Sequence, residues 1–197
     1  MMKTILCAGA LAAICMDAGA ADGSSVNVYG LVDVALVRET GGSAGDVTKI
    51  TSGVGAGSRL GFKGREDLGG GLAAIFLLES GFQADTGALG QGGLLFGRQA
   101  YAGLQGGFGT LTAGRQYTPQ YLTVVLADPF GSGYAGDTKN LMAPSGNSTS
   151  RMDNSLKYVS PGVGGVSAEV VYGAGEVAGD SAAGRQFGGA LDYNAGP

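Results

Sequence analysis

The charged side chains of this chain lie on short segments in which they alternate with apolar residues. Arg59, Lys63 and Arg65 alternate with Leu60 and Phe62. In an extended strand the cations therefore share one face and the apolar side chains share the other. Fixed charges on one face and apolar groups on the other suit a wall with water on one side and lipid on the other.

Residue types used in catalysis are sparse. The chain has no His, and its two Cys residues, Cys7 and Cys15, lie within the first 20 residues. An enzyme would then need a carboxylate pair or a Ser-Lys arrangement. Asp33, Glu79 and Asp153 lie on separate expected strands with no catalytic motif around them. We therefore predict that the chain is not an enzyme and has no catalytic site, no metal site and no cofactor.

The N-terminal residues 1–20 have the features of a secretory signal peptide. Lys3 precedes a short apolar run that ends at Cys15, and the small residues Ala18, Gly19 and Ala20 form a cleavage site. The apolar run is too short for a membrane-spanning helix. Export, together with strands in which polar and apolar residues alternate, predicts that the protein lies in the outer membrane of a Gram-negative bacterium, with the membrane lipid as a partner. The net charge of -4 argues against a nucleic-acid partner.

Glycine-rich turns divide residues 21–197 into about eight strands, each near the 9–11 residues of a tilted membrane strand. Tight turns alternate with long connections, of which 118–150 is the longest, and this alternation is typical of outer-membrane barrels. We predict an all-β fold, an antiparallel transmembrane β-barrel. The expected strands are 25–38, 57–67, 72–84, 95–105, 109–117, 151–160, 165–174 and 184–194.

Alternation along each strand assigns its charged residues to a face. Asp33 shares the inward phase of Tyr29, and Glu79 lies on the inward face of the third expected strand. Arg115 is in phase with Leu111 and should face outward. A cation facing lipid is costly.

Six segments carry motifs that together resemble one family. They are 25–33 (SVNVYGLVD), 57–72 (GSRLGFKGREDLGGGL), 78–82 (LESGF), 95–104 (LFGRQAYAGL), 109–117 (GTLTAGRQY) and 154–161 (NSLKYVSP). In this order they resemble the trimeric general-diffusion porins of Gram-negative bacteria, in the branch common in β-proteobacteria. The resemblance covers nearly all of the chain after the signal peptide.

The resemblance implies a barrel of about 16 strands, a homotrimer, and passive passage of ions and small hydrophilic solutes. With a trimer implied, we expect the outward-facing Arg115 at the trimer interface. It also implies a third loop folded into the lumen, for which residues 118–150 are the candidate, with Asp128 and Asp137 on its acidic side. Opposed charges across a narrow aqueous gap create a transverse field. The ion preference stays open because basic and acidic groups nearly balance. The facing basic wall would consist of Arg59, Lys63, Arg98 and Arg151.

The resemblance also bears on the extent of the chain. The family would continue from residues 194–197 into a ninth strand, so we expect this chain to represent the N-terminal half of a porin barrel. The alternative is a complete eight-stranded barrel, an anchor or adhesion protein whose interior is filled by side chains. Against this alternative, the 118–150 loop would have no lumen to fold into.

Overall fold

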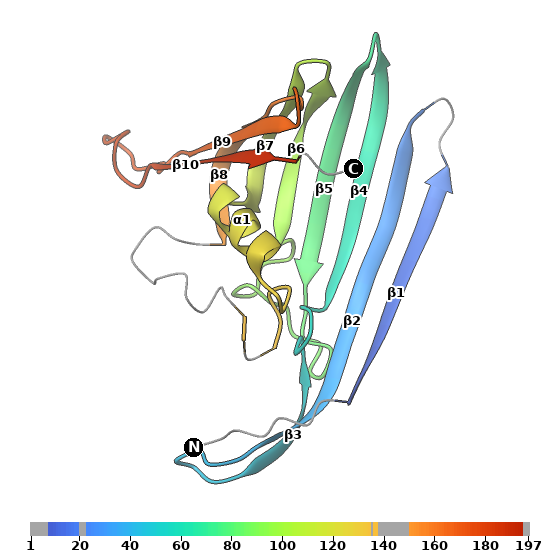
Figure 1. Ribbon diagram of the computed structural model, residues 1–197, viewed down its shortest axis with the longest axis vertical. Coiled ribbons are helices and arrows are strands. Elements are labelled where there is room, and N and C mark those ends of the chain that lie inside the picture. Colours follow the sequence, from blue (N-terminus) through green and yellow to red (C-terminus); the bar gives the residue numbers. More distant parts are fainter. Residues whose placement is uncertain (1–7, 20–22, 135, 138–149, 195–197) are drawn as a thin grey trace.

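The computed structural model describes residues 8–19, 23–134, 136–137 and 150–194. Ten strands in these parts of the chain form one sheet in the order β1-β2-β4-β5-β6-β7-β8-β9-β10, with β3 also paired to β2 (Figure 1). The helix α1 (Pro119–Ala127) follows β7. The strands are β1 (Ala8–Gly19), β2 (Ser25–Glu39), β3 (Val47–Ser52), β4 (Arg59–Gly69), β5 (Leu72–Gly81), β6 (Gln99–Gly106), β7 (Gly109–Tyr117), β8 (Arg151–Val159), β9 (Val166–Gly173) and β10 (Gln186–Tyr193).

The predicted all-β, antiparallel architecture is confirmed. Each strand pairs antiparallel with its neighbours, and the sheet curves from β1 round to β10 (Figure 1). The described sheet is not closed, since β1 and β10 stand at opposite ends of the strand order. Its curvature gives the sheet an inner face, on which α1 packs against β9 and β10.

The two faces of the sheet differ in polarity. On the outer face Leu111 and Leu156 are exposed, at 38% and 49%. On the inner face the Thr112 hydroxyl donates to Gln116 Oε1 (2.7 Å), and Gln116 Nε2 donates to Ser155 Oγ (3.1 Å). These three polar side chains are buried. Apolar groups outside and hydrogen-bonded polar groups inside are the reverse of a soluble domain and suit lipid as the outer solvent.

Two strands lie outside the predicted set. β3 falls within the expected 39–56 connection and extends the pairing of β2. β1 falls within the expected signal peptide and pairs with β2 from Ala8–Leu36 to Gly19–Ser25. A strand edge exposes N–H and C=O groups that another extended segment can satisfy, which explains the pairing of β1 physically. The assignment of residues 1–20 to a signal peptide stays a prediction.

The predicted 118–150 loop contains a helix at its start. The Thr118 hydroxyl oxygen caps α1 by accepting from the Tyr121 amide (3.2 Å), and the buried Pro119 opens the first turn. The structure thus differs from the expected irregular loop at residues 119–127. The run PQYLTVVLA is apolar without a clear polar face, so periodicity did not reveal it. Within the described residues, no helix is long and apolar enough to cross a membrane.

Thr118→Ala tests this cap. We expect α1 to lose about 1 kcal/mol of local stability, because the Tyr121 amide loses its acceptor. Faster hydrogen exchange at the Tyr121 amide would report the loss. Thr123→Ala is the matched control, since Thr123 Oγ1 donates to the Pro119 carbonyl within the helix and caps nothing. Equal exchange at Tyr121 in both variants would show that the cap does not stabilise the helix start.

Candidate functional site

A cavity of 710 Å³ lies between the inner face of the sheet and the chain that follows α1. On the sheet side it is lined by Arg59 of β4 and Glu79 of β5. On the opposite side it is lined by Tyr121 of α1 and by Ser132, which belongs to residues 128–134, called here the inner segment. The fold therefore places charged side chains of the sheet opposite an inward-folded segment, across a gap wide enough for water and small ions.

Glu79 is the centre of the charge network on the sheet side. Its side chain is 6% exposed and accepts from Arg98 Nε (2.6 Å), while Arg59 Nε lies 3.9 Å away. The Tyr29 hydroxyl donates to Glu79 Oε2 (2.7 Å). This last bond crosses β4 at Gly61, which pairs with both Tyr29 and Glu79. Because Gly61 has no side chain, the Tyr29 ring can lie over β4 and reach the carboxylate.

Tyr117, at the end of β7, holds two of the arginines that line the cavity. The Tyr117 hydroxyl accepts from Arg98 Nη2 (2.9 Å) and from Arg151 Nη2 (3.0 Å). The Arg151 guanidinium also lies 4.7 Å from the centre of the Tyr117 ring, and its Nε donates to the Arg98 carbonyl (2.8 Å). Tyr117 stacks on Tyr121 at 4.8 Å. Two guanidinium groups are thus fixed close together by hydrogen bonds and cation–π contact.

The structure brings most of the predicted basic wall together. Arg59, Arg98 and Arg151 line the same cavity, together with Glu79. Lys63, which follows Arg59 along β4, is exposed and does not line the cavity. Its ammonium lies 5.7 Å from the centre of the Tyr29 ring. Among the described residues, the cavity lining therefore has three guanidinium groups and one carboxylate.

The two acidic residues predicted for the loop side of the passage, Asp128 and Asp137, are buried and do not line the cavity. The Asp128 carboxylate accepts from the amides of Phe130 (2.8 Å) and Ser132 (3.0 Å), so it folds the turn of the inner segment. Among the described residues, no three His, Cys, Asp or Glu side chains gather into a possible metal site.

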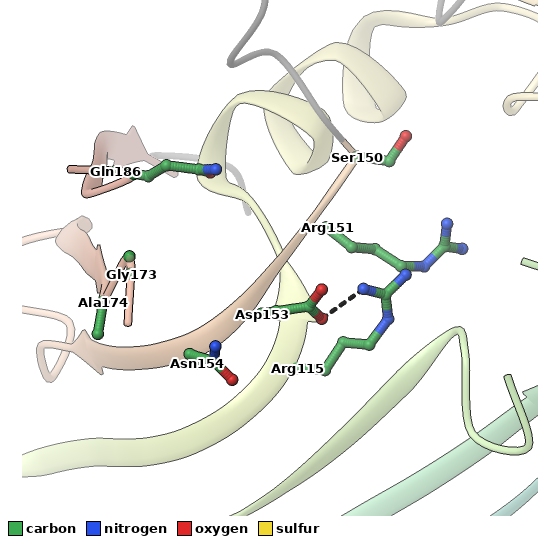
Figure 2. Close-up of a pocket in the computed structure, with 10 residues that line it drawn as sticks. Arg115, Ser150, Arg151, Asp153, Asn154, Gly173, Ala174 and Gln186 are labelled. Carbon is green, nitrogen blue, oxygen red and sulfur yellow. Dashed lines mark hydrogen bonds and ion pairs between the residues drawn. The ribbon is translucent and has the colours of Figure 1, made fainter. Parts of the chain in front are cut away.

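Arg115 lies apart from this cavity, beside a smaller one of 390 Å³. It pairs with Ala100 in the β6–β7 ladder, next to a register shift between Gly114 and Gln116 in the β7–β8 ladder. Its Nη1 pairs with Asp153 and its Nε donates to the Gly97 carbonyl (2.8 Å). Figure 2 shows the Arg115 and Asp153 side chains pointing toward each other. Its expected place at a subunit contact stays a prediction, although an ion pair within the chain already lowers the cost of its charge.

Reasoning from sequence missed the two stacked tyrosines. Tyr117 ends β7 and Tyr121 lies on the first turn of α1. The signal was available, because Thr118 followed by Pro119 is typical of a helix start and places the tyrosines one turn apart. Recognising that helix would have predicted an aromatic contact between the sheet and the inner chain.

Comparisons with known proteins agree with this architecture. Residues 7–197 match the model of the Gram-negative porin family. The chain is 38% identical over 188 residues to an outer membrane porin protein of Bordetella pertussis, covering 87% of this chain and 48% of that protein. It is 34% identical over 206 residues to outer membrane porin protein 32 of Delftia acidovorans, covering 100% of this chain and 57% of that protein.

A solved structure gives the same result. The anion-selective porin from Comamonas acidovorans matches with a TM-score of 0.76 and 32% sequence identity. The match covers 88% of this chain and 55% of that porin. The chain therefore spans about half the length of the relatives it matches.

Proposed function

This chain belongs to the Gram-negative porin family, and we propose that it builds part of a water-filled outer-membrane channel for passive diffusion. The permeating species are ions and small hydrophilic solutes. The ten-stranded sheet forms one part of the barrel wall, with lipid against its apolar outer face and water against its polar inner face. The family resemblance in the six segments is confirmed by the family match and the named relatives.

The observation that carries this proposal is the charged cavity between the sheet and the inner segment. Its lining includes Arg59, Arg98 and Arg151, and the only acidic residue among its lining residues within the described chain is Glu79. In a narrow aqueous passage such an excess of fixed positive charge concentrates anions and repels cations. We therefore propose that the channel prefers anions. The matched porin from Comamonas acidovorans is anion-selective by name, which supports this direction.

Two finer features belong to the same proposal. We propose a homotrimer, which rests on the family resemblance, and no catalytic activity, since the relatives are named porins. The alternative of a small barrel packed with side chains is less well supported. A packed interior would not leave a cavity of 710 Å³ lined by four charged groups.

A planar bilayer tests the proposal directly. Protein containing this chain, extracted from the outer membrane in its native assembly, should produce stepwise increases in current. A salt gradient of about one decade across the bilayer should give a reversal potential with the sign of anion preference. The absence of steps would reject the channel. Steps with a reversal potential of cation preference would retain the channel and reject the role proposed for the three arginines.

A further inference from the structure

Between β3 and β4, the chain separates from β2. β2 pairs with β4 up to Leu31–Arg59 and with β3 from Val34–Ser52 onward. Residues 53–58, called here the 53–58 loop, turn away from the ladder at this gap. Ser58 Oγ accepts from the Asp33 amide (3.0 Å) and lies 3.2 Å from the Asp33 carbonyl oxygen, to which it donates. The buried Ser58 hydroxyl and the Gly53 amide, which donates to the Asp33 carbonyl (3.1 Å), thus tie the ends of the loop to β2.

The Asp33 side chain holds the far part of this loop. Its Oδ2 accepts from the amides of Gly55 (2.8 Å) and Ala56 (2.6 Å). Asp33 is 6% exposed, so both bonds are sheltered from bulk water. Hydrogen bonds from backbone amides to a carboxylate are stronger than those to a neutral acceptor. Asp33 therefore fixes the 53–58 loop against the inner face of the sheet.

The 53–58 loop in turn supports the arginines of the sheet wall. Arg59 Nη1 donates to the Gly57 carbonyl (3.2 Å). A Cβ added at Gly57 would lie 3.0 Å from Arg98 Nη1, so the Arg98 guanidinium packs directly on the Gly57 backbone. A shift of the Gly57 backbone would therefore move both Arg59 and Arg98, the two cations that flank Glu79.

The same loop also contacts the inner segment. The Tyr134 amide donates to the Val54 carbonyl (2.6 Å). A Cβ added at Gly133 would overlap the Gly55 carbonyl, so the two backbones are in direct contact. Ser132 and Tyr134 have φ of 60° and 58°. Such left-handed conformations are costly for residues other than glycine and persist where surrounding contacts hold them.

We propose that Asp33 is a positioning residue for the pore: it fixes the 53–58 loop, which holds the inner segment and the arginine wall at a set separation. This inference rests on the proposed channel function and goes beyond it. Without the Asp33 carboxylate, the amides of Gly55 and Ala56 lose their acceptor, and the loop and the inner segment move relative to the sheet. The passage then fluctuates in width while its charged side chains remain present.

A pair of substitutions separates this role from that of a simple lumen charge. Both amides donate to one oxygen, Oδ2. In Asp33→Asn an amide oxygen can occupy that place, so the bonds persist although the charge is gone. In Asp33→Ala both the bonds and the charge are gone. A lumen charge would give the same result in both variants, whereas a positioning role predicts that only Asp33→Ala differs strongly from the wild type.

The experiment measures the hydrogen exchange of the Tyr134 amide and the open-channel current noise on protein in its native assembly. We expect Asp33→Ala to exchange about tenfold faster at Tyr134 and to show frequent current substates. Asp33→Asn should stay close to the wild type in both measurements. Equal changes in the two variants, or no change in either, would overturn the proposal.

Gly133→Ala approaches the same contact from the inner segment. Its new methyl group cannot fit against the Gly55 carbonyl, so this variant should reproduce the fast exchange and the noise of Asp33→Ala. If Asp33→Ala does not reach the membrane, wild-type behaviour of Gly133→Ala overturns the proposal. Hydrogen exchange does not require conduction. A silent wild-type protein would therefore reject the channel, while the exchange data would still decide whether Asp33 holds the inner segment.

Discussion

Arg98→Gln is expected to move the ion preference of the assembled channel severalfold toward cations, the largest selectivity change for a single substitution at the cavity. The substitution removes one of three guanidinium groups. It also removes the cation nearest to Glu79, at 2.6 Å, and leaves that carboxylate with the Tyr29 hydroxyl at 2.7 Å and Arg59 at 3.9 Å. The loss of this one positive charge raises cation attraction and lowers anion attraction, because both depend on the same net field in the passage.

Reversal potentials in a salt gradient measure this shift. Lys63→Gln is the matched control. It also removes one positive charge, but from an exposed position on β4 that lies outside the cavity. Charge at that position is largely screened by salt, so its reversal potential should remain near that of the wild type. Equal shifts in the two variants would show that the cavity does not set selectivity.

A second substitution checks the mechanism. In the variant Arg98→Gln with Glu79→Gln, most of the cation shift should disappear, because the released carboxylate is gone. Additive fixed charges give this result, because the loss of one cation and one carboxylate leaves the net charge of the described lining as in the wild type. A full cation shift in the double variant would show that the Glu79 carboxylate does not contribute to the field in the passage. Arg59→Gln should produce a smaller shift than Arg98→Gln, since Glu79 keeps its closer partner. A larger effect at Arg59 would refute the proposed order of the two pairs.

Gly61→Ala is expected to destabilise the barrel wall by about 1–3 kcal/mol, the cost of an added group in a packed site. Its Cβ would occupy the space of the Tyr29 ring. The ring must then move, and its hydroxyl loses the bond to Glu79. The midpoint of thermal unfolding, followed by the loss of β-sheet circular dichroism, should fall.

Two controls separate the causes of that loss. Gly107→Ala adds the same methyl group where no atom lies within 4 Å, so its unfolding midpoint should match the wild type. Tyr29→Phe removes the hydroxyl and keeps the ring, so it should cost about 1 kcal/mol, the typical value of one hydrogen bond. If Gly61→Ala costs no more than Gly107→Ala, close packing of Tyr29 over β4 does not contribute to stability.

Eight of the ten described strands, and the faces of Arg59 and Glu79, could be predicted from the sequence, whereas β1 and β3 were not. Alternation has a period of two residues and is a local property, so Arg59 and Glu79 could be assigned to the inner face before the sheet was known. Gly61 pairs with Glu79, and Arg59 lies two residues before Gly61 on β4. Arg59 and Glu79 therefore share one face of the sheet, as expected. The motifs around these strands also identified the family correctly.

The partners of the carboxylates could not be predicted in this way. Asp33 and Asp128 have the charge expected of a pore lining, yet both accept from backbone amides of nearby loops. Which amides face a carboxylate depends on backbone conformations in loops, including the left-handed φ of Ser132. Those conformations are set by contacts between distant segments, such as Tyr134 with Val54, and no local pattern records them.

The sequence by itself determined a polar face and an apolar face for each strand, because side chains alternate on any extended backbone. Only the tertiary structure decided which charges share a passage. Lys63 and Arg59 lie on the same face of β4, but the inner segment and the 53–58 loop close a cavity around Arg59 alone of the two. The physical reason is that an enclosed space is formed by several segments at once, while the phase of a side chain depends on its own strand.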